Sequence, residues 1–183
     1  MHWAFDNTDY GLIYYQEGYF LFRRGADPRR NLPLLALSAE PQIQHPQRIV
    51  LGRSVAFLGY DLYPESAVPG QPVFLTTYWE SLAPVDRPYV LFLAVPGTRI
   101  TGDPVHGLSP VIDWQPGQII RDERIFALPA LADGSDYEMA VGLLVGKAEP
   151  RLASPEQFLG RNVIRIGGVD ARAGRYTFAA FAR

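Results

Sequence analysis

The chain has 183 residues, 48% of them hydrophobic, which predicts one domain of ordinary size, or a domain with a small attachment, with a packed core and excludes a largely disordered chain. Its formal net charge at pH 7 is only -2 and its cations are scattered, which argues against nucleic acid as a partner. The absence of cysteine excludes disulfides, thiolate nucleophiles and cysteine-ligated zinc.

The sequence also gives no sign of a membrane span or a secretion signal. A helix needs about 20 apolar residues to cross a bilayer, and no run in this chain approaches that length. The start, Met1 to Asp6, lacks the layout of a signal peptide. We therefore expect the chain as given to be soluble, whether or not it belongs to a longer protein.

Residues 10–24 have the pattern of a β-hairpin. Two aromatic and aliphatic runs flank Gln16-Glu17-Gly18, a connection in which Gly18 is available for a left-handed conformation. An isolated hairpin is marginal in water, so this one is expected to pack on another part of the protein. Residues 25–47 are rich in Pro, Arg and Gln, which predicts an extended linker with a short buried turn near residues 34–37. We assign residues 1–47 to the hairpin and linker and 48–183 to the main domain.

From Val50 onward, short apolar runs alternate with Pro-Gly and Asp-Gly turns. No stretch has the length and period of a convincing helix, although one helical turn is expected at 154–159, with Ser154 as its N-cap. This spacing predicts an all-β fold, an Ig- or fibronectin-III-like antiparallel β-sandwich of about seven strands. Strands are expected at 53–62, 72–80, 88–95, 98–102, 118–128, 136–145 and 161–169, with a last strand after Gly174.

Three residues or residue pairs support this interpretation. Pro116-Gly117 suits a type II turn, because Pro fixes φ and Gly accepts the positive φ that follows. Tyr137 follows the Asp133-Gly134 break and resembles the tyrosine corner of Ig-like sandwiches, in which the hydroxyl group bonds nearby backbone. Trp79 is expected to fill the core between the sheets rather than to bind a ligand.

The order of these features resembles a known module, the Ig-like sandwich that follows the membrane-spanning part of some bacterial polytopic proteins similar to dolichyl-phosphate-mannose-type and other lipid-carrier glycosyltransferases. The resemblance covers residues 50–170 well and the first 30 weakly, where Gly18-Tyr-Phe-Leu-Phe-Arg-Arg-Gly25 resembles the end of the preceding segment in related multi-spanning proteins of unknown function. It rests on Leu75-Thr-Thr-Tyr-Trp79-Glu-Ser-Leu82, Pro88-Tyr-Val-Leu-Phe92, Gly102-Asp103-Pro104, Trp114-Gln-Pro-Gly117 with Asp122, Leu128-Pro129, Tyr137, Val141-Gly-Leu143 and Arg151-Leu152.

The resemblance implies an accessory domain on the extracytoplasmic face of a longer membrane protein. Catalysis in such a parent would use acidic residues near its membrane segments, which this chain lacks. The partners implied are glycan or the membrane part of the parent chain. Because the matching positions are mostly turn and core residues, they specify a fold more than a task.

Candidate chemical groups are few. His2, His45 and His106 lie in unrelated segments without metal-ligand spacing, so no metal or other cofactor is predicted. Asp103 and His106, three residues apart, could touch each other or bond a sugar hydroxyl; alternatively, Asp103 binds only loop backbone. Asp122 and Glu123 are adjacent on a strand and face opposite sides, which removes them as a carboxylate pair for glycoside cleavage.

Aromatic side chains could still bind a sugar, because flat rings with a polar rim suit sugar rings. Trp114 is the best candidate for an exposed ring, followed by Tyr14, Tyr15 and Tyr19, although core packing is an alternative for each. The sequence therefore favours a non-catalytic accessory domain that contacts glycan or a neighbouring domain. The alternatives are a free-standing carbohydrate-binding module and, less favoured, a hydrolase.

Overall fold

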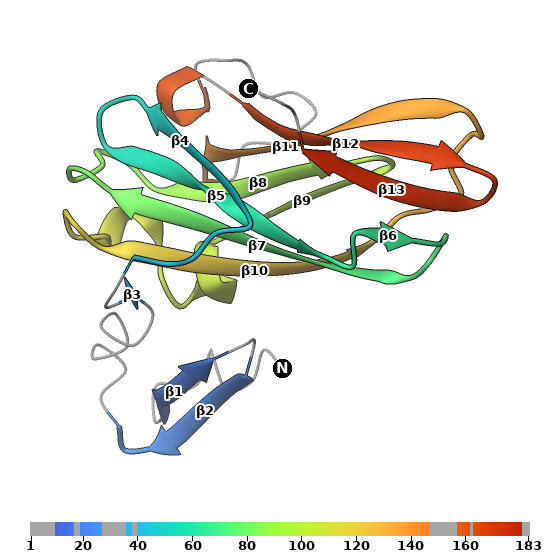
Figure 1. Cartoon of the computed structure of the whole chain (residues 1–183). Helices are drawn as coiled ribbons and strands as arrows, with labels where there is room; N and C mark the ends of the chain where they lie inside the picture. The colour runs from blue at the N-terminus through green and yellow to red at the C-terminus, as the bar shows by residue number, and fades with distance from the viewer. Residues whose placement is uncertain are drawn as a thin grey trace.

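The structure is a computed structural model, and it describes residues 10–16, 19–26, 36–37, 40–146, 157–161 and 163–180. Two antiparallel sheets lie face to face and form a β-sandwich (Figure 1). The structure also describes three short 3-10 turns, η2 (Pro104–Gly107), η3 (Val111–Asp113) and η5 (Leu159–Arg161). The predicted all-β sandwich is confirmed.

The first sheet has five strands in the order β3-β10-β7-β5-β4. Strand β10 alternates along its whole length between a buried and an outward side chain, and β7 does so over its first half, as expected for a sheet with one face on the core. The strands are β3 (Ala36–Leu37), β10 (Ile119–Ala127), β7 (Pro72–Ser81), β5 (Val55–Tyr63) and β4 (His45–Leu51).

The second sheet has six strands in the order β6-β13-β12-β11-β8-β9. The chain enters it at β6, returns to the first sheet for β7, and crosses between the sheets three more times, so each sheet is assembled from distant segments (Figure 1). Its strands are β6 (Ser66–Ala67), β13 (Arg175–Ala180), β12 (Ile164–Arg172), β11 (Ser135–Val145), β8 (Tyr89–Val95) and β9 (Thr98–Gly102).

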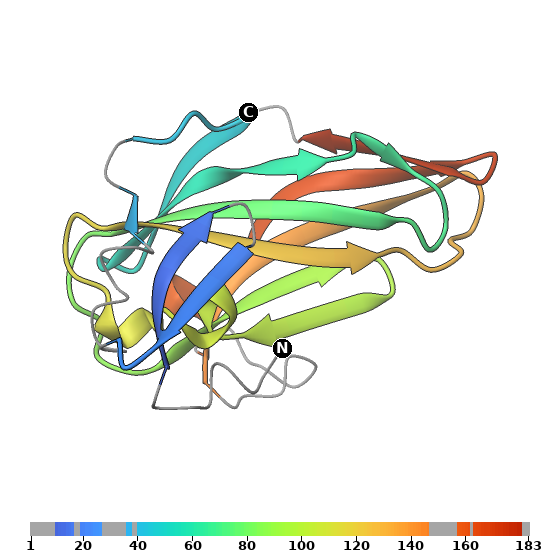
Figure 2. The same cartoon turned by 90° about the horizontal axis from the view of Figure 1, so that it is seen from below.

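The N-terminal hairpin consists of β1 (Tyr10–Gln16) and β2 (Tyr19–Arg24). Figure 2 shows it over the side of the sandwich that carries β10 and the 3-10 turns. Phe22 of β2 is half-buried and packs against the main core cluster. The expectation that the hairpin packs on another part of the protein is therefore confirmed.

Together the two sheets contain eleven described strands, against the seven or eight expected. The additional strands are β3, β4 and β6, and the first two fall in or reach into the segment predicted as a linker. Strands of two residues cannot show a period, and β4 contains Pro46, which disfavours a strand prediction. β12 also continues to Arg172, so its hairpin turn is Ala173-Gly174 rather than the longer one expected. Ser154 of the predicted helical turn lies outside the described residues.

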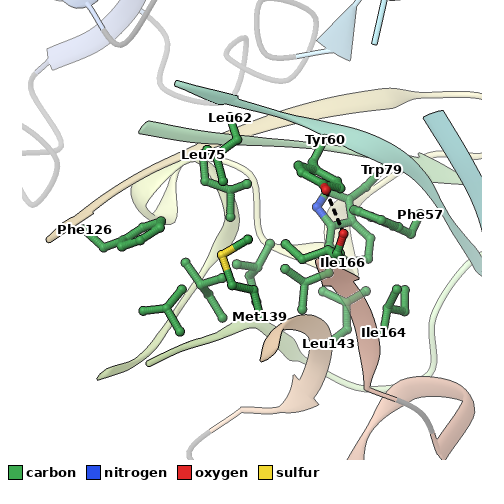
Figure 3. Packing of buried hydrophobic residues seen from close by; sticks show 14 of the residues in the cluster. Phe57, Tyr60, Leu62, Leu75, Trp79, Phe126, Met139, Leu143, Ile164 and Ile166 are labelled. Atoms are coloured by element: carbon green, nitrogen blue, oxygen red, sulfur yellow. Dashed lines mark hydrogen bonds between the residues drawn. The ribbon is translucent and has the colours of Figure 1, made fainter. Parts of the chain in front are cut away.

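The core fills the space between the sheets. Trp79 is completely buried, tilts against Phe57, and donates its indole N–H to the Thr77 hydroxyl at 2.9 Å. Its predicted role as a core residue is confirmed. Figure 3 shows how side chains from both sheets meet around Met139, a flexible side chain that fills irregular space.

Two tyrosines hold the segment that joins β10 to β11. The Tyr137 hydroxyl accepts a hydrogen bond from the Ala132 backbone N–H at 3.2 Å, which is the predicted corner contact. The Tyr176 hydroxyl donates to the Pro129 carbonyl at 2.8 Å and accepts from the Leu131 N–H at 3.0 Å. These contacts satisfy backbone groups of a segment that belongs to no strand.

Candidate functional site

Trp114 does not present its ring to solvent. It follows η3, is only 2% exposed, and belongs to the main core cluster. Its indole N–H bonds both the carbonyl and the hydroxyl oxygen of Ser109, each at 3.0 Å. The hypothesis of Trp114 as an exposed sugar platform is therefore wrong, because turn η3 folds the ring inward. The alternative, that Trp114 packs in the core, is confirmed.

Asp103 and His106 lie at the two ends of turn η2, and both are exposed. Asp103 precedes the turn without a side-chain capping bond, while its backbone carbonyl accepts from Arg124 at 2.7 Å. His106 has a φ of 55°, a conformation that residues other than glycine rarely adopt. His2 and the side chains of Tyr14, Tyr15 and Tyr19, the other candidates in the N-terminal segment, lie outside the described residues.

A buried ion pair between Asp122 and Arg124 of β10 holds the backbone of turn η2 in place. Arg124 contacts both carboxylate oxygens of Asp122, at 2.8 and 3.1 Å, and Asp122 also accepts from the Val105 N–H at 2.6 Å. Asp122 is completely buried and Arg124 is 8% exposed. Since no solvent reaches Asp122, this pair serves the fold and does not offer a reaction centre.

Three exposed apolar side chains lie in one row on the outer face of the first sheet. Phe74 in β7 lies directly opposite Tyr63 of β5 on one side and opposite Ile125 of β10 on the other. Directly opposed residues of antiparallel strands point to the same face, with Cβ atoms about 5 Å apart. Tyr63 is 72% exposed, Phe74 47% and Ile125 63%. We call these three residues the aromatic face.

A polar row borders the aromatic face. Asp61 lies opposite Thr76, which in turn lies opposite Glu123. The Asp61 carboxylate is held in place, since it accepts from the Gln44 N–H at 2.6 Å and from the Tyr78 hydroxyl at 2.7 Å. Burial, followed by this hydrogen bond to Asp61, raises the pKa of Tyr78 well above its usual value, so the phenol stays protonated as a donor.

An open hollow of about 460 Å³ runs along the junction of the aromatic face and this polar row. It combines ring faces with carboxylate, hydroxyl and amide groups, and we call it the rim hollow. Its lining residues are Gln44, Asp61, Leu62, Tyr63, Pro64, Glu65, Ser66, Phe74 and Thr76.

A smaller cavity of about 220 Å³ opens between the edges of the two sheets and shares Leu62 and Glu65 with the rim hollow. The His45 ring stacks on Tyr60 at its border, with ring centroids 4.7 Å apart. His45 is half-buried there. The rest of the lining is mainly apolar, namely Leu62, Met139, Phe178, Ala179 and Ala180.

Over the described ranges, no group of three or more His, Asp or Glu residues is arranged to hold a metal ion. Likewise, no helix there is both long and apolar enough to pass through a membrane. Comparisons of the chain with protein-family models, with curated proteins and with solved structures gave no match.

The sequence did contain a signal for the aromatic face. Tyr63, Phe74 and Ile125 are large apolar residues on the outward positions of their strands, where a polar residue is usual. Alternation alone could mark each one as unusual. It could not show that the three lie in one row, because that depends on the register between strands distant in sequence.

Proposed function

We propose that this chain is a non-catalytic β-sandwich module that binds glycan at the aromatic face. The observation that carries the proposal is the pair of exposed rings, Tyr63 and Phe74, opposed on neighbouring strands beside a polar hollow. Flat rings cover the apolar face of a sugar, and nearby carboxylate, amide and hydroxyl groups bond its hydroxyls. Both rings lie on strands, Tyr63 on β5 and Phe74 on β7, which hold them more rigidly than loops would, so little order is lost on binding.

The arrangement of acidic groups favours binding over catalysis. Cleavage of a glycosidic bond requires two carboxyl groups that act as acid and as base or nucleophile. In the rim hollow, both oxygens of Asp61 accept bonds from the fold itself, and Glu65 is exposed beside Gln44.

The resemblance noted in the sequence gives this module a context. As an accessory domain of a longer membrane protein similar to lipid-carrier glycosyltransferases, it would hold glycan at the extracytoplasmic face. As a free-standing carbohydrate-binding module, it would use the same aromatic face. Both alternatives require the same contacts, so one set of variants tests the binding step.

The test is a titration of the purified chain against a panel of soluble oligosaccharides, followed by NMR or calorimetry. Tyr63→Ala and Phe74→Ala should each weaken binding about tenfold or more, since truncating an aromatic anchor at a binding site costs about 2 kcal/mol. Ile112→Ala is the matched control, because Ile112 is an equally exposed apolar residue on turn η3. Unchanged affinity in the Tyr63→Ala/Phe74→Ala double variant, or no binding across the panel, would refute the proposal.

A further inference from the structure

The charge around the rim hollow is one-sided. Its described lining contains two carboxylates, Asp61 and Glu65, and no Lys, Arg or His. The neighbouring carboxylate of Glu123 is already paired with Arg121 on the same strand, so it adds little net charge. The negative charge beside the rings therefore comes from Asp61 and Glu65.

This charge restricts which glycan fits. A sugar that carries a carboxylate, sulfate or phosphate would be repelled by two carboxylates within the same hollow. A protonated amine would be attracted by them, and it would gain further from the faces of Tyr63 and Phe74, because aromatic rings attract cations. The hollow thus combines the two features that recognise an organic cation, rings and carboxylates.

We propose that the aromatic face selects glycans with a free, protonated amine, as in a de-N-acetylated amino sugar. The proposal rests on the proposed function above, since it names the class of glycan bound at the same site. Glu65 is the residue that makes the selection. Asp61 is committed to Gln44 and Tyr78, whereas Glu65 is exposed and lines both the rim hollow and the cavity between the sheets.

Three β-1,4-linked hexose oligosaccharides of equal length provide the test, because they share one backbone and differ only at carbon 2. One carries a free amine, one an N-acetyl group and one a hydroxyl group. Titrations are run at about pH 5.5, where ordinary carboxyl groups are ionised and a sugar amine is protonated. We expect the amine series to bind about five to ten times more tightly than the hydroxyl series at low salt, the sum of one exposed charge pair and one cation–π contact.

Glu65→Gln should remove most of that preference, measured as the ratio of the affinities for the amine and hydroxyl series, because the substitution keeps the side-chain size and removes the charge. Glu138→Gln is the matched control, since Glu138 is an exposed residue of β11 on the other sheet. The preference should also shrink in high salt, which screens exposed charges.

The outcomes separate the two proposals. Equal affinity for all three series, with binding still sensitive to Tyr63→Ala, overturns amine selection and leaves glycan binding intact. No binding of any series overturns both. If Tyr63→Ala leaves the affinity for the amine series unchanged, that series is attracted by surface charge alone, and selection at this face is refuted. If a tri-lysine peptide binds as tightly as the amine series, with the same dependence on Glu65, the natural ligand is a lysine side chain of another protein, and an amino sugar as the ligand is refuted.

Discussion

The Tyr60 hydroxyl in β5 donates a 2.7 Å hydrogen bond to the carbonyl oxygen of Ile166 in β12, so it joins the two sheets inside the core (Figure 3). Ile166 needs this partner because it lies at a break in register, where Met139 pairs with Gly167 and Ala140 with Arg165. A residue at such a bulge is left out of the ladder. The hydroxyl therefore satisfies a backbone group that the sheet does not.

Replacing Tyr60 with Phe should lower the free energy of unfolding by about 1–3 kcal/mol, because the buried Ile166 carbonyl loses its partner. Urea denaturation followed by circular dichroism measures the change. Tyr63→Phe is the control, since Tyr63 is on the same strand but 72% exposed, and it should leave the stability unchanged. Equal effects of the two substitutions would contradict a special role for the Tyr60 hydroxyl.

The same burial should make the protein sensitive to alkali. Burial raises the pKa of Tyr60 from its ordinary value of 10.0 to about 12. The unfolded chain therefore loses this proton at lower pH than the folded chain does, so the stabilisation is complete below pH 10 and is lost as pH rises toward about 12. Urea midpoints should fall across this interval, and less so in Tyr60→Phe. Tyr78, whose pKa is also raised, should account for part of the remaining fall. A flat profile would count against this assignment.

The pair Asp122–Arg124 has a matched counterpart in Asp170–Arg172. Both are Asp-x-Arg on one strand with an Nε to Oδ distance of 2.8 Å, but the first is buried and the second is exposed. Asp122→Asn should cost about 3–5 kcal/mol, because it leaves the Arg124 charge buried without compensation. Asp170→Asn should change the urea midpoint very little, since water replaces the lost partner. Similar losses for both would show that burial does not govern the effect.

The contact of Tyr137 with Ala132 predicts a local effect. Tyr137→Phe should lower the stability by about 0.5–1.5 kcal/mol and should accelerate hydrogen exchange of the Ala132 amide. Tyr176→Phe should instead accelerate exchange at Leu131, because that amide bonds the Tyr176 hydroxyl. Exchange that accelerates equally at both amides in either variant would mean that the segment opens as one unit.

Substitutions of Trp114 should change the stability of the protein without changing its affinity for glycan. Trp114→Ala should destabilise the protein by about 3–5 kcal/mol, the usual cost of truncating a buried Trp. Trp114→Phe should be milder and should leave glycan affinity unchanged, because the ring lies in the core and not at the aromatic face. A Trp114→Phe variant that stays folded but loses glycan binding would return Trp114 to the site.

Particular residues show how far sequence reasoning reached. Local chemistry identified the turn at Pro116-Gly117, where Gly117 has a φ of 85° and the Gln118 N–H bonds the Gln115 carbonyl. It also identified Tyr137 as a corner residue and Trp79 as part of the core. It placed Trp114 only by its position beside a turn, and the direction of its ring depends on η3, a turn of three residues without a sequence period.

The sequence by itself determined that this chain is an all-β sandwich, because alternation and turn residues act over a few neighbouring positions. It could not determine that Tyr63, Phe74 and Ile125 share one row, or that Asp122 is buried under turn η2. Those relationships arise from the pairing of strands far apart in the chain, and a shift of one residue in that pairing would turn each side chain to the other face. Only the tertiary structure, through that register, places rings and carboxylates together on the outer face of the first sheet.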